Sequence, residues 1–344
     1  MSPSPTSLYD PSTTLWRPLP LRVLFFLVRA LAELALVLSV FWGTLALYFE
    51  LNTFVAILFF LISAVVLIAA RPRWKGLSVY AGIFAVVLLW WTTSVTPSND
   101  RPWEKPVAIA PTASIEGDKV TIHNLRDFDF RSATDFKPRY REAVVKLSQL
   151  QTLDFFVCRA GDSLFARTLM SFGFSDGQYI NISAEPRLEI DEPYSLIKNF
   201  LRQYELFYTV ADERDAVRFR ANFAGEKVRM YRLQVPAEVI HKTFVDYLHA
   251  MNTLAAEPRF YDAVLDGWTS EMHRHALPYA ANSRWNWRLI FNGEIERLAY
   301  DNGVLVESMS FRDLKAASLI NDASKAADRA VDYSVKIRAA RPEF

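Results

Sequence analysis

The chain has 344 residues, of which 39 are basic and 38 acidic, so the formal net charge is only +1. This balance and the lack of a basic block argue against nucleic-acid binding as the main role. A single cysteine, Cys158, excludes an internal disulfide and any multi-cysteine metal site. The charge is unevenly spread: residues 1–100 hold only six basic and four acidic residues, a composition typical of a membrane segment, and the rest resembles a globular domain.

Three apolar stretches follow one another near the N-terminus, at residues 30–49, 53–70 and 76–95. Each is close to the roughly 20 residues that a helix needs to cross hydrocarbon. The sequence therefore predicts three transmembrane helices within residues 29–95, with Trp42, Trp90 and Trp91 as interfacial anchors. Glu33 follows Arg29 by one helical turn, which indicates an i, i+4 ion pair rather than an ion path.

The loop charges predict how these helices are oriented. Arg17, Arg22 and Arg29 precede the first stretch, the loop at residues 50–52 has no positive charge, and residues 71–75 carry three. The positive-inside rule then places residues 1–28 in the cytoplasm of a bacterium. After three crossings the remaining chain faces the periplasm, so the predicted location is the inner membrane and one predicted partner is the lipid bilayer.

Residues 96–118 are rich in Pro, Ser and Asn and indicate a linker. Beyond it, the apolar patterns predict a domain over residues 119–344 in which strands come first and helices later. This order is typical of an α+β fold. Strands are predicted at residues 119–130, 153–160, 169–174, 179–185, 206–212, 216–223 and 227–234, and helices at 193–204, 236–255, 258–276, 311–321 and 322–341.

Few residues point to a particular chemistry. His273 and His275 would face different directions on a helix and no acidic cluster accompanies them, so we expect no metal site. The sequence has neither a dinucleotide-binding nor a Walker motif, so we expect no nucleotide cofactor and no other cofactor. Cys158 lies inside an apolar strand pattern, which is typical of a buried cysteine rather than a nucleophile.

Several motifs in the right order resemble one family, the Lnb N-terminal periplasmic domain family, from about residue 119 onward. They are VTIHNLRDFDFRSATDF, LMSFGFSDGQYINISAEPRLE, FLRQYELFYTVADERDAVRFR, LDGWTSEMHRH, WNWRLIFNGEIERLAYDNGVL and LINDASKAADRA. The resemblance implies a mixed α/β domain similar to a circularly permuted papain-like (NlpC/P60-like) fold. It also implies a substrate class of lipoproteins and acyl chains, since the family is named after an enzyme that acylates lipoprotein N-termini. Such an enzyme would pair a strand histidine with a cysteine at a helix start, whose thiolate would carry the acyl group.

This chain departs from the family pattern at both of those positions. Arg167 stands where family members have the histidine, and Trp268 stands where they have the cysteine. Arginine does not act as a base at neutral pH, and an indole is not an acyl nucleophile. The double substitution predicts a catalytically inactive homologue whose site binds a ligand or partner: a lipoprotein, an acyl chain or an envelope protein.

The resemblance also assigns the surroundings of this site. The predicted binding residues are Arg167, Ser183, Glu185, Arg187, Trp268 and Thr269. Further positions that fit the family pattern are Glu205, Asp212, Glu213, Arg214, Asp215, Trp287 and Arg288. Two alternatives stay open: an active acyltransferase or hydrolase whose nucleophile is Cys158 or Ser270, and a structural scaffold of an envelope complex.

Overall fold

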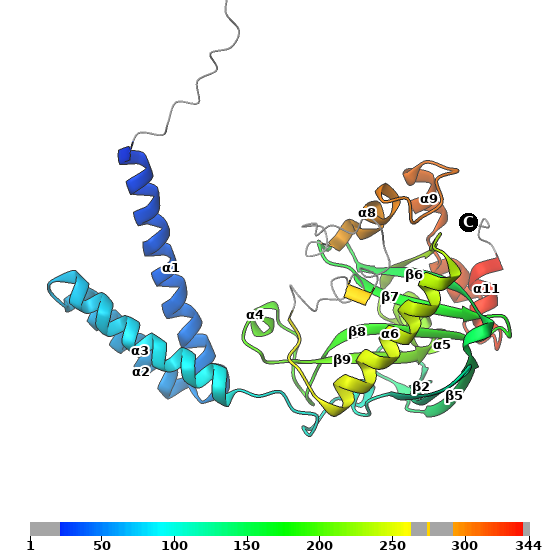
Figure 1. Cartoon of the computed structure of the whole chain (residues 1–344), viewed down its shortest axis with the longest axis horizontal. Helices are drawn as coiled ribbons and strands as arrows, with labels where there is room; N and C mark the ends of the chain where they lie inside the picture. The colour runs from blue at the N-terminus through cyan, green and yellow to red at the C-terminus, as the bar shows by residue number, and fades with distance from the viewer. Residues whose placement is uncertain (1–20, 263–273, 276–291, 340–344) are drawn as a thin grey trace, which may run out of the picture. The chain divides into compact units, whose positions relative to one another are not determined.

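The computed structural model describes residues 21–262, 274–275 and 292–339. The chain divides into two compact units, Met1–Val95 and Thr96–Phe344, which we call the N-terminal unit and the C-terminal unit. Figure 1 shows the elements of each unit along the chain. Each unit is described by itself below.

The N-terminal unit contains three apolar helices, α1 (Leu21–Glu50), α2 (Thr53–Ala69) and α3 (Arg73–Ser94). Two of them, α1 from Val23 onward and α3, are long and apolar enough to cross a membrane. By length and composition, two of the three predicted spans are therefore candidates. With 17 residues, α2 extends for about 26 Å at 1.5 Å per residue, which is shorter than a hydrocarbon core of about 30 Å.

Small residues and interhelical contacts hold these helices together. A Cβ added at Gly43 would lie 2.9 Å from the Phe59 ring, so α1 and α2 approach closely where only glycine fits. The hydroxyl groups of Ser39 and Tyr80 are 2.7 Å apart and join α1 to α3. Arg29 donates to Glu33 at 3.0 Å, which confirms the predicted i, i+4 pair.

Two of the tryptophans predicted as boundary anchors contact each other. The rings of Trp42 and Trp91 meet edge to face with centroids 5.0 Å apart, and Trp91 is buried. These two side chains therefore pack α1 against α3.

The C-terminal unit is built on a mixed sheet of eight strands with the order β1-β2-β9-β8-β7-β6-β10, in which β5 pairs with β2. Every pairing is antiparallel except the parallel contact between β2 and β9. The strands are β1 (Thr112–Glu116), β2 (Lys119–Arg126), β5 (Tyr140–Lys146), β6 (Leu150–Ala160), β7 (Arg167–Phe174), β8 (Tyr179–Arg187), β9 (Glu205–Asp212) and β10 (Glu226–Arg232). A small second sheet pairs β3 (Asp129–Phe130) with β4 (Phe136–Lys137).

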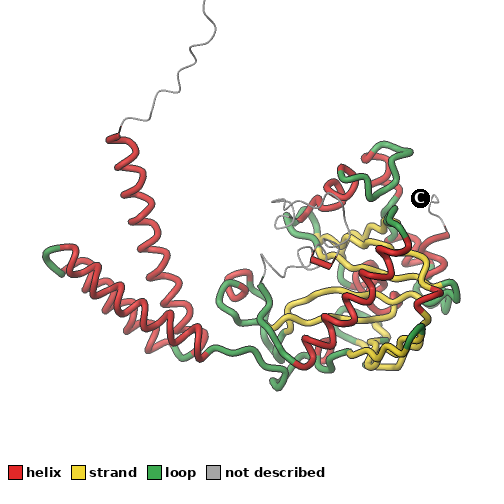
Figure 2. Tube along the Cα trace, viewed as in Figure 1, coloured by secondary structure: helices red, strands yellow, loops and turns green. Residues whose placement is uncertain are grey.

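Helices cover both faces of this sheet (Figures 1 and 2). On one face, α6 (Ala237–Ala256) buries Ile240, Phe244, Tyr247, Leu248 and Met251 against the largest apolar core. These are the residues that the helical spacing predicted. On the other face lie α5 (Glu213–Arg218), the π-helical turn η3 (Phe219–Phe223), α10 (Asn321–Ala326) and α11 (Tyr333–Ala339), which share a second core with β6, β7 and β10. The short helices η6 (Asn292–Glu294), α8 (Ile295–Asp301) and α9 (Phe311–Ala317) complete the described elements near the C-terminus.

Most predicted strands are confirmed, and one is wrong. Residues 216–223 are helical, because Asp212 caps the turn by accepting from the Arg214 backbone N–H at 2.9 Å and Glu213 and Asp215 follow in the first turn. The predicted helix 193–204 is reduced to one turn, α4 (Leu196–Asn199), and 322–341 forms two short helices. The predicted helix 258–276 falls largely outside the described residues.

The segment predicted as a linker, residues 96–118, is an ordered part of the C-terminal unit. It contains the short helix η1 (Lys105–Val107) and β1, and it buries Trp103. Asn99 donates to the carbonyls of Leu254 and Ala255 at the end of α6. The Pro and Ser content therefore reflects an extended backbone that is fixed by hydrogen bonds to other elements.

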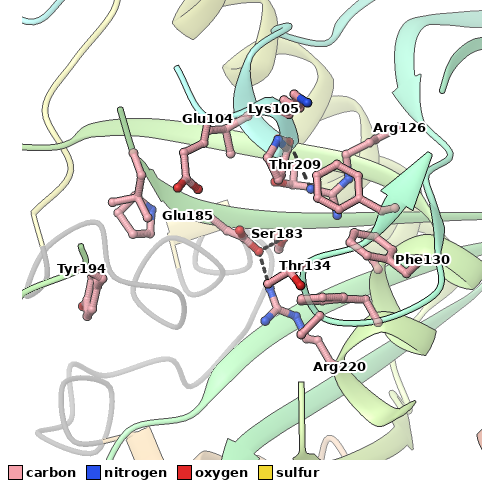
Figure 3. A pocket seen from close by; sticks show the side chains of 18 of the residues that line it. Glu104, Lys105, Arg126, Phe130, Thr134, Ser183, Glu185, Tyr194, Thr209 and Arg220 are labelled. Carbon is pink, nitrogen blue, oxygen red and sulfur yellow. Dashed lines mark hydrogen bonds and ion pairs between the residues drawn. The ribbon is translucent and has the colours of Figure 1, made fainter. Parts of the chain in front are cut away.

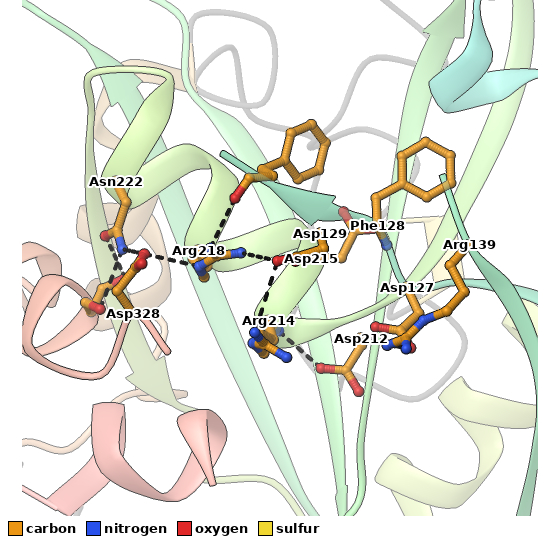
Figure 4. Close-up of polar contacts among 12 residues, drawn as sticks. Asp127, Phe128, Asp129, Arg139, Asp212, Arg214, Asp215, Arg218, Asn222 and Asp328 are labelled. Carbon is orange, nitrogen blue, oxygen red and sulfur yellow. Dashed lines mark hydrogen bonds and ion pairs between the residues drawn. The ribbon is translucent and has the colours of Figure 1, made fainter. Parts of the chain in front are cut away.

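The charged side chains of α5 and η3 form buried ion pairs with several other elements. Asp215 accepts two hydrogen bonds from the Arg126 guanidinium, at 2.8 and 2.9 Å, and a third from the Phe128 backbone N–H. Arg218 donates to Asp328 at 2.9 Å, and Asn222 donates to the same carboxylate (Figure 4). The helix is charged yet buried because each charge has a partner on a different element.

The pair of Glu213 and Arg338 ties α5 to α11. Arg338 donates to both oxygens of Glu213, at 2.6 and 2.7 Å, and to Asp154 of β6 at 2.7 and 2.9 Å. Asp154 and Glu213 are almost fully buried. One guanidinium therefore compensates two buried carboxylates from two different elements.

We expect Arg338→Ala to lower the free energy of unfolding of the full chain by about 3–5 kcal/mol, because it leaves the buried Glu213 charge without its cation. The check is chemical denaturation followed by circular dichroism. The matched control is Lys336→Ala on the same helix, whose exposed pair with Asp332 should leave the midpoint unchanged. Equal midpoints for the two variants would contradict this assignment.

Candidate functional site

A cavity of about 590 Å³ opens between the strands β7, β8 and β9, the η3 turn and the segment that contains η1 (Figure 3). Its polar wall is formed by side chains from three neighbouring strands and the η3 turn. It is lined by Glu104, Lys105, Arg126, Thr134, Arg167, Ser183, Glu185, Asp191, Thr209 and Arg220, together with apolar residues. A volume of this size is within the range of small-molecule sites.

Glu185 lies at the centre of the charged wall. It accepts hydrogen bonds from Arg220 at 2.6 Å and from the Ser183 hydroxyl at 3.1 Å (Figure 3). Burial alone would raise the pKa of this carboxyl, but the positive charges of Arg220, Arg167 and Arg126 outweigh burial and lower the pKa below its usual value. Glu185 is therefore ionised, and its carboxylate orients the neighbouring guanidinium groups around the cavity.

Arg167 begins β7 at the edge of the same cavity. The strand register pairs Arg167 with Cys158 of β6, and continuing the β7–β8 register beyond its last pair places Arg167 opposite Glu185. Residues that face each other in an antiparallel pair project to the same side of the sheet. The sheet therefore brings the guanidinium of Arg167 to the cavity side together with Ser183 and Glu185.

The other walls of the cavity are largely apolar. Phe130 and Phe219 are in contact, with ring centroids 4.4 Å apart, and Phe136 packs beside Phe130. Leu188, Ile190 and Tyr194 line the opposite side. The site thus combines a charged wall of both signs, with three arginines beside Glu104, Glu185 and Asp191, with an aromatic and aliphatic surface.

The structure brings three of the predicted binding residues together: Arg167, Ser183 and Glu185 all line the cavity. Arg187 does not line it. Its guanidinium donates to the carbonyls of Val107 and Ala108 and stacks between Trp103 and Phe207, so it fixes the segment before β1. The predictions for Trp268, Thr269, Ser270, Trp287 and Arg288 lie outside the described residues.

The remaining family positions are structural. Glu213 and Asp215 belong to the buried pairs of α5, Asp212 caps that helix, and Glu205 accepts a hydrogen bond from the Ser98 backbone N–H at 3.1 Å. Arg214 lies 3.8 Å from Asp129.

The sequence patterns did not indicate that Arg126, Thr209 and Arg220 line the cavity. Arg220 was placed on a predicted strand, and only the helical geometry of η3 directs it at Glu185. A usable signal existed for Thr209, because a polar residue in an otherwise apolar strand is unusual. Its Oγ1 is buried and makes no hydrogen bond to a described group.

A second polar cluster lies on the other face of the sheet. His275 is buried, its Nδ1 lies 2.7 Å from Asp246 on α6, and its Nε2 lies 3.0 Å from the Tyr208 hydroxyl. The centroids of the His275 and Tyr247 rings are 4.0 Å apart. These contacts tie residues 274–275 to the core. Among the residues described by the structure, no group of three or more His, Cys, Asp or Glu side chains could hold a metal ion.

The comparison with protein families gives one match. Residues 136–292 match the family described as the Lnb N-terminal periplasmic domain. The matched range contains most of the cavity, from Phe136 to Arg220, and is shorter than the range over which the sequence motifs resemble the family. No curated protein and no solved structure gave a match.

We expect Cys158 to be inert towards thiol reagents in the native protein. The side chain is about 1% exposed, and burial raises the pKa of its thiol. Ellman's reagent should react with no thiol at neutral pH until denaturant unfolds the chain, after which it should react with one. Rapid reaction of the folded protein would contradict this burial.

The acid stability of the protein should depend on Glu185. Because its folded pKa lies below its unfolded pKa, the ionised carboxylate stabilises the fold above the unfolded pKa of about 4.3, and this contribution is lost as the pH falls through the folded pKa. We expect Glu185→Gln to lower the free energy of unfolding by about 2 kcal/mol at neutral pH, since one charge-assisted hydrogen bond is weakened.

Denaturation across a pH series measures this difference, which should shrink below the unfolded pKa. Glu116→Gln, at an exposed glutamate, is the control and should follow the wild-type curve at every pH. A difference that stays constant down to strongly acid pH would contradict the ionised assignment of Glu185.

Proposed function

We propose that this protein is a membrane-anchored periplasmic binding protein of the bacterial envelope, because its residues 136–292 match the Lnb N-terminal periplasmic domain family. Its cavity binds an envelope molecule that carries a carboxylate or phosphate and an apolar chain, and it does so without chemical turnover. The observation that carries this proposal is the position of Arg167, which lines the cavity together with Ser183 and Glu185.

The chemistry of the cavity supports an anionic, partly apolar ligand. Arg126, Arg167 and Arg220 place three guanidinium groups around Glu185, and Arg126 and Arg220 also have carboxylate partners at Asp215 and Glu226. A planar guanidinium recognises a carboxylate or phosphate through two parallel hydrogen bonds. The phenylalanines across the cavity offer an apolar surface for an acyl chain.

Two points favour binding over catalysis. By motif resemblance Arg167 takes the family's histidine position, and arginine is not a base at neutral pH. Cys158, one of the two fallback nucleophiles, is buried and its thiol pKa is raised, so its thiolate is disfavoured. We propose the permuted papain-like arrangement of the family for this domain. By motif resemblance, Trp268 takes the position of the family's nucleophilic cysteine.

The proposed orientation follows the charges between the helices. In this proposal, α2 joins α1 and α3 as a third crossing, which its 17 apolar residues allow in a locally thin bilayer. Arg71, Arg73 and Lys75 then lie in the cytoplasm with the N-terminus, and residue 96 emerges into the periplasm.

The direct test is ligand binding by the full chain in lipid nanodiscs. The probes are octanoate and octyl phosphate, with octanol as the uncharged match, and calorimetry gives each Kd. We expect the anionic probes to bind and Arg167→Ala to weaken them about 10- to 100-fold, the loss of one charge-assisted contact of roughly 1.5–3 kcal/mol. The Kd of Arg167→Lys should lie between those of the wild type and Arg167→Ala, because lysine keeps the charge but lacks the planar guanidinium group.

Arg139→Ala is the control, because Arg139 is exposed and does not line the cavity. It should bind the probes as the wild type does. The proposal is wrong if octanol binds as tightly as octanoate, or if Arg167→Ala and Arg139→Ala bind alike. Release of an acyl chain from a lipoprotein by the purified chain would favour the enzymatic alternative.

A further inference from the structure

The exposed apolar side chains of the C-terminal unit are concentrated in one short segment. Eleven large apolar side chains are exposed in its described part, and five of them lie within residues 190–200. These five are Ile190, Tyr194, Leu196, Ile197 and Phe200, with exposed fractions from 37 to 61%. We call this segment, which contains α4, the α4 loop.

The α4 loop is held by hydrogen bonds of its Ser195, Asn199 and Tyr194 groups. The Tyr204 hydroxyl accepts from the Ser195 N–H at 2.9 Å and donates to the Pro193 carbonyl at 3.0 Å. Asn199 is buried and donates to the Tyr194 hydroxyl. Polar contacts therefore hold the loop from within and leave Leu196, Ile197 and Phe200 outside, the reverse of the usual arrangement on a water-exposed loop.

The loop is also next to the segment that leads from the membrane helices. The Ile190 N–H donates to the Pro102 carbonyl at 2.8 Å, and the Glu104 N–H donates to the Leu188 carbonyl at 2.9 Å. Since α3 ends at Ser94 and the Ser98 N–H already bonds Glu205, only three residues lie between them. The four Cα-to-Cα steps from Ser94 to Ser98 reach at most about 14 Å. A membrane that holds α3 is therefore within reach of this part of the unit.

We propose that the α4 loop inserts into the surface of the lipid bilayer, with Leu196, Ile197 and Phe200 as the inserted side chains. Moving these three side chains from water to the acyl boundary lowers the free energy in proportion to the apolar area that is buried. The short connection to α3 limits how far the loop can move from a membrane that holds this helix. Lys198 lies between the apolar residues, and its pair with Glu192 at 2.8 Å compensates both charges within the loop.

One consequence rests on the proposed function. Leu188, Ile190 and Tyr194 also line the cavity, so an inserted loop would place the cavity wall at the lipid surface. A ligand with an acyl chain could then enter from the bilayer without crossing water.

The test uses the full chain in nanodiscs of phosphatidylethanolamine and phosphatidylglycerol. Single cysteines at Ile197→Cys and Phe200→Cys carry the fluorophore NBD, and the control is Val331→Cys, whose native side chain is 98% exposed. The native Cys158 is buried and should stay unlabelled. We expect emission at positions 197 and 200 to shift to shorter wavelength and to be quenched by spin-labelled lipid, and the label at 331 to be quenched by aqueous iodide.

The inference is overturned if iodide quenches positions 197 and 200 as it does 331. It is also overturned if neither quencher reaches them, because protein, such as a second copy of this chain, would then cover the loop. No ligand is used, so failure here leaves the Arg167 binding test intact, and failure of that test leaves this result intact.

A second measurement addresses the consequence for ligand entry. We expect the double variant Ile197→Ser and Phe200→Ser to slow the uptake of a long-chain fatty acid from vesicles and to leave the Kd for octanoate unchanged. Equal uptake rates for the variant and the wild type would refute entry through the bilayer.

Discussion

The C-terminal unit depends on compensating the charges that α5 and η3 carry into its interior. Within eight residues this segment buries Glu213, Asp215, Arg218 and Arg220. An uncompensated buried charge costs several kcal/mol, so each must meet an opposite charge. The partners come from β2, β8, α11 and the turn after α10, and their distribution fixes how the small sheet, the large sheet and the C-terminal helices pack together.

The candidate site is part of this arrangement. Arg220 is both the last charge of the buried series and a wall of the cavity, where Glu185 holds it. The neighbouring Arg126 is held by Asp215 in the same way. Guanidinium groups whose positions are fixed by ion pairs are pre-organised for a ligand, which reduces the entropy lost on binding.

The sequence predicted the parts of the fold that local periodicity determines. The spacing of Ile240, Phe244 and Tyr247 predicts α6 and its buried face, and the apolar runs predict β6 to β10 apart from their exact ends. The prediction failed at residues 216–223, where Arg218 and Arg220 alternate with apolar residues as in a strand. Both arginines are buried in a helical segment, because each is paired with a carboxylate of another element. The three apolar N-terminal helices were predicted, and two of them are long and apolar enough to cross a membrane. The third, α2, is apolar but shorter.

Part of the cavity lining was predicted from the sequence. Arg167, Ser183 and Glu185 lie on adjacent strands, so motif resemblance was enough to group them. Arg126 and Arg220 join them from elements far away in the sequence, through ion pairs that no local pattern reveals. Arg187 was grouped with the site because it alternates with Ser183 and Glu185, yet its contacts are with the backbone of residues 107–108.

That position of Arg187 has a mechanical consequence. Asn99 is bonded to Arg187 at 2.9 Å, and Ser98 is bonded to Glu205, directly opposite Arg187 on the neighbouring strand. Any tension along the chain at residue 96 therefore acts first on the ends of β8 and β9, two and four residues from Glu185 and Thr209. A pull on the chain at residue 96 would be transmitted as shear to the strand pair that carries the polar wall of the cavity.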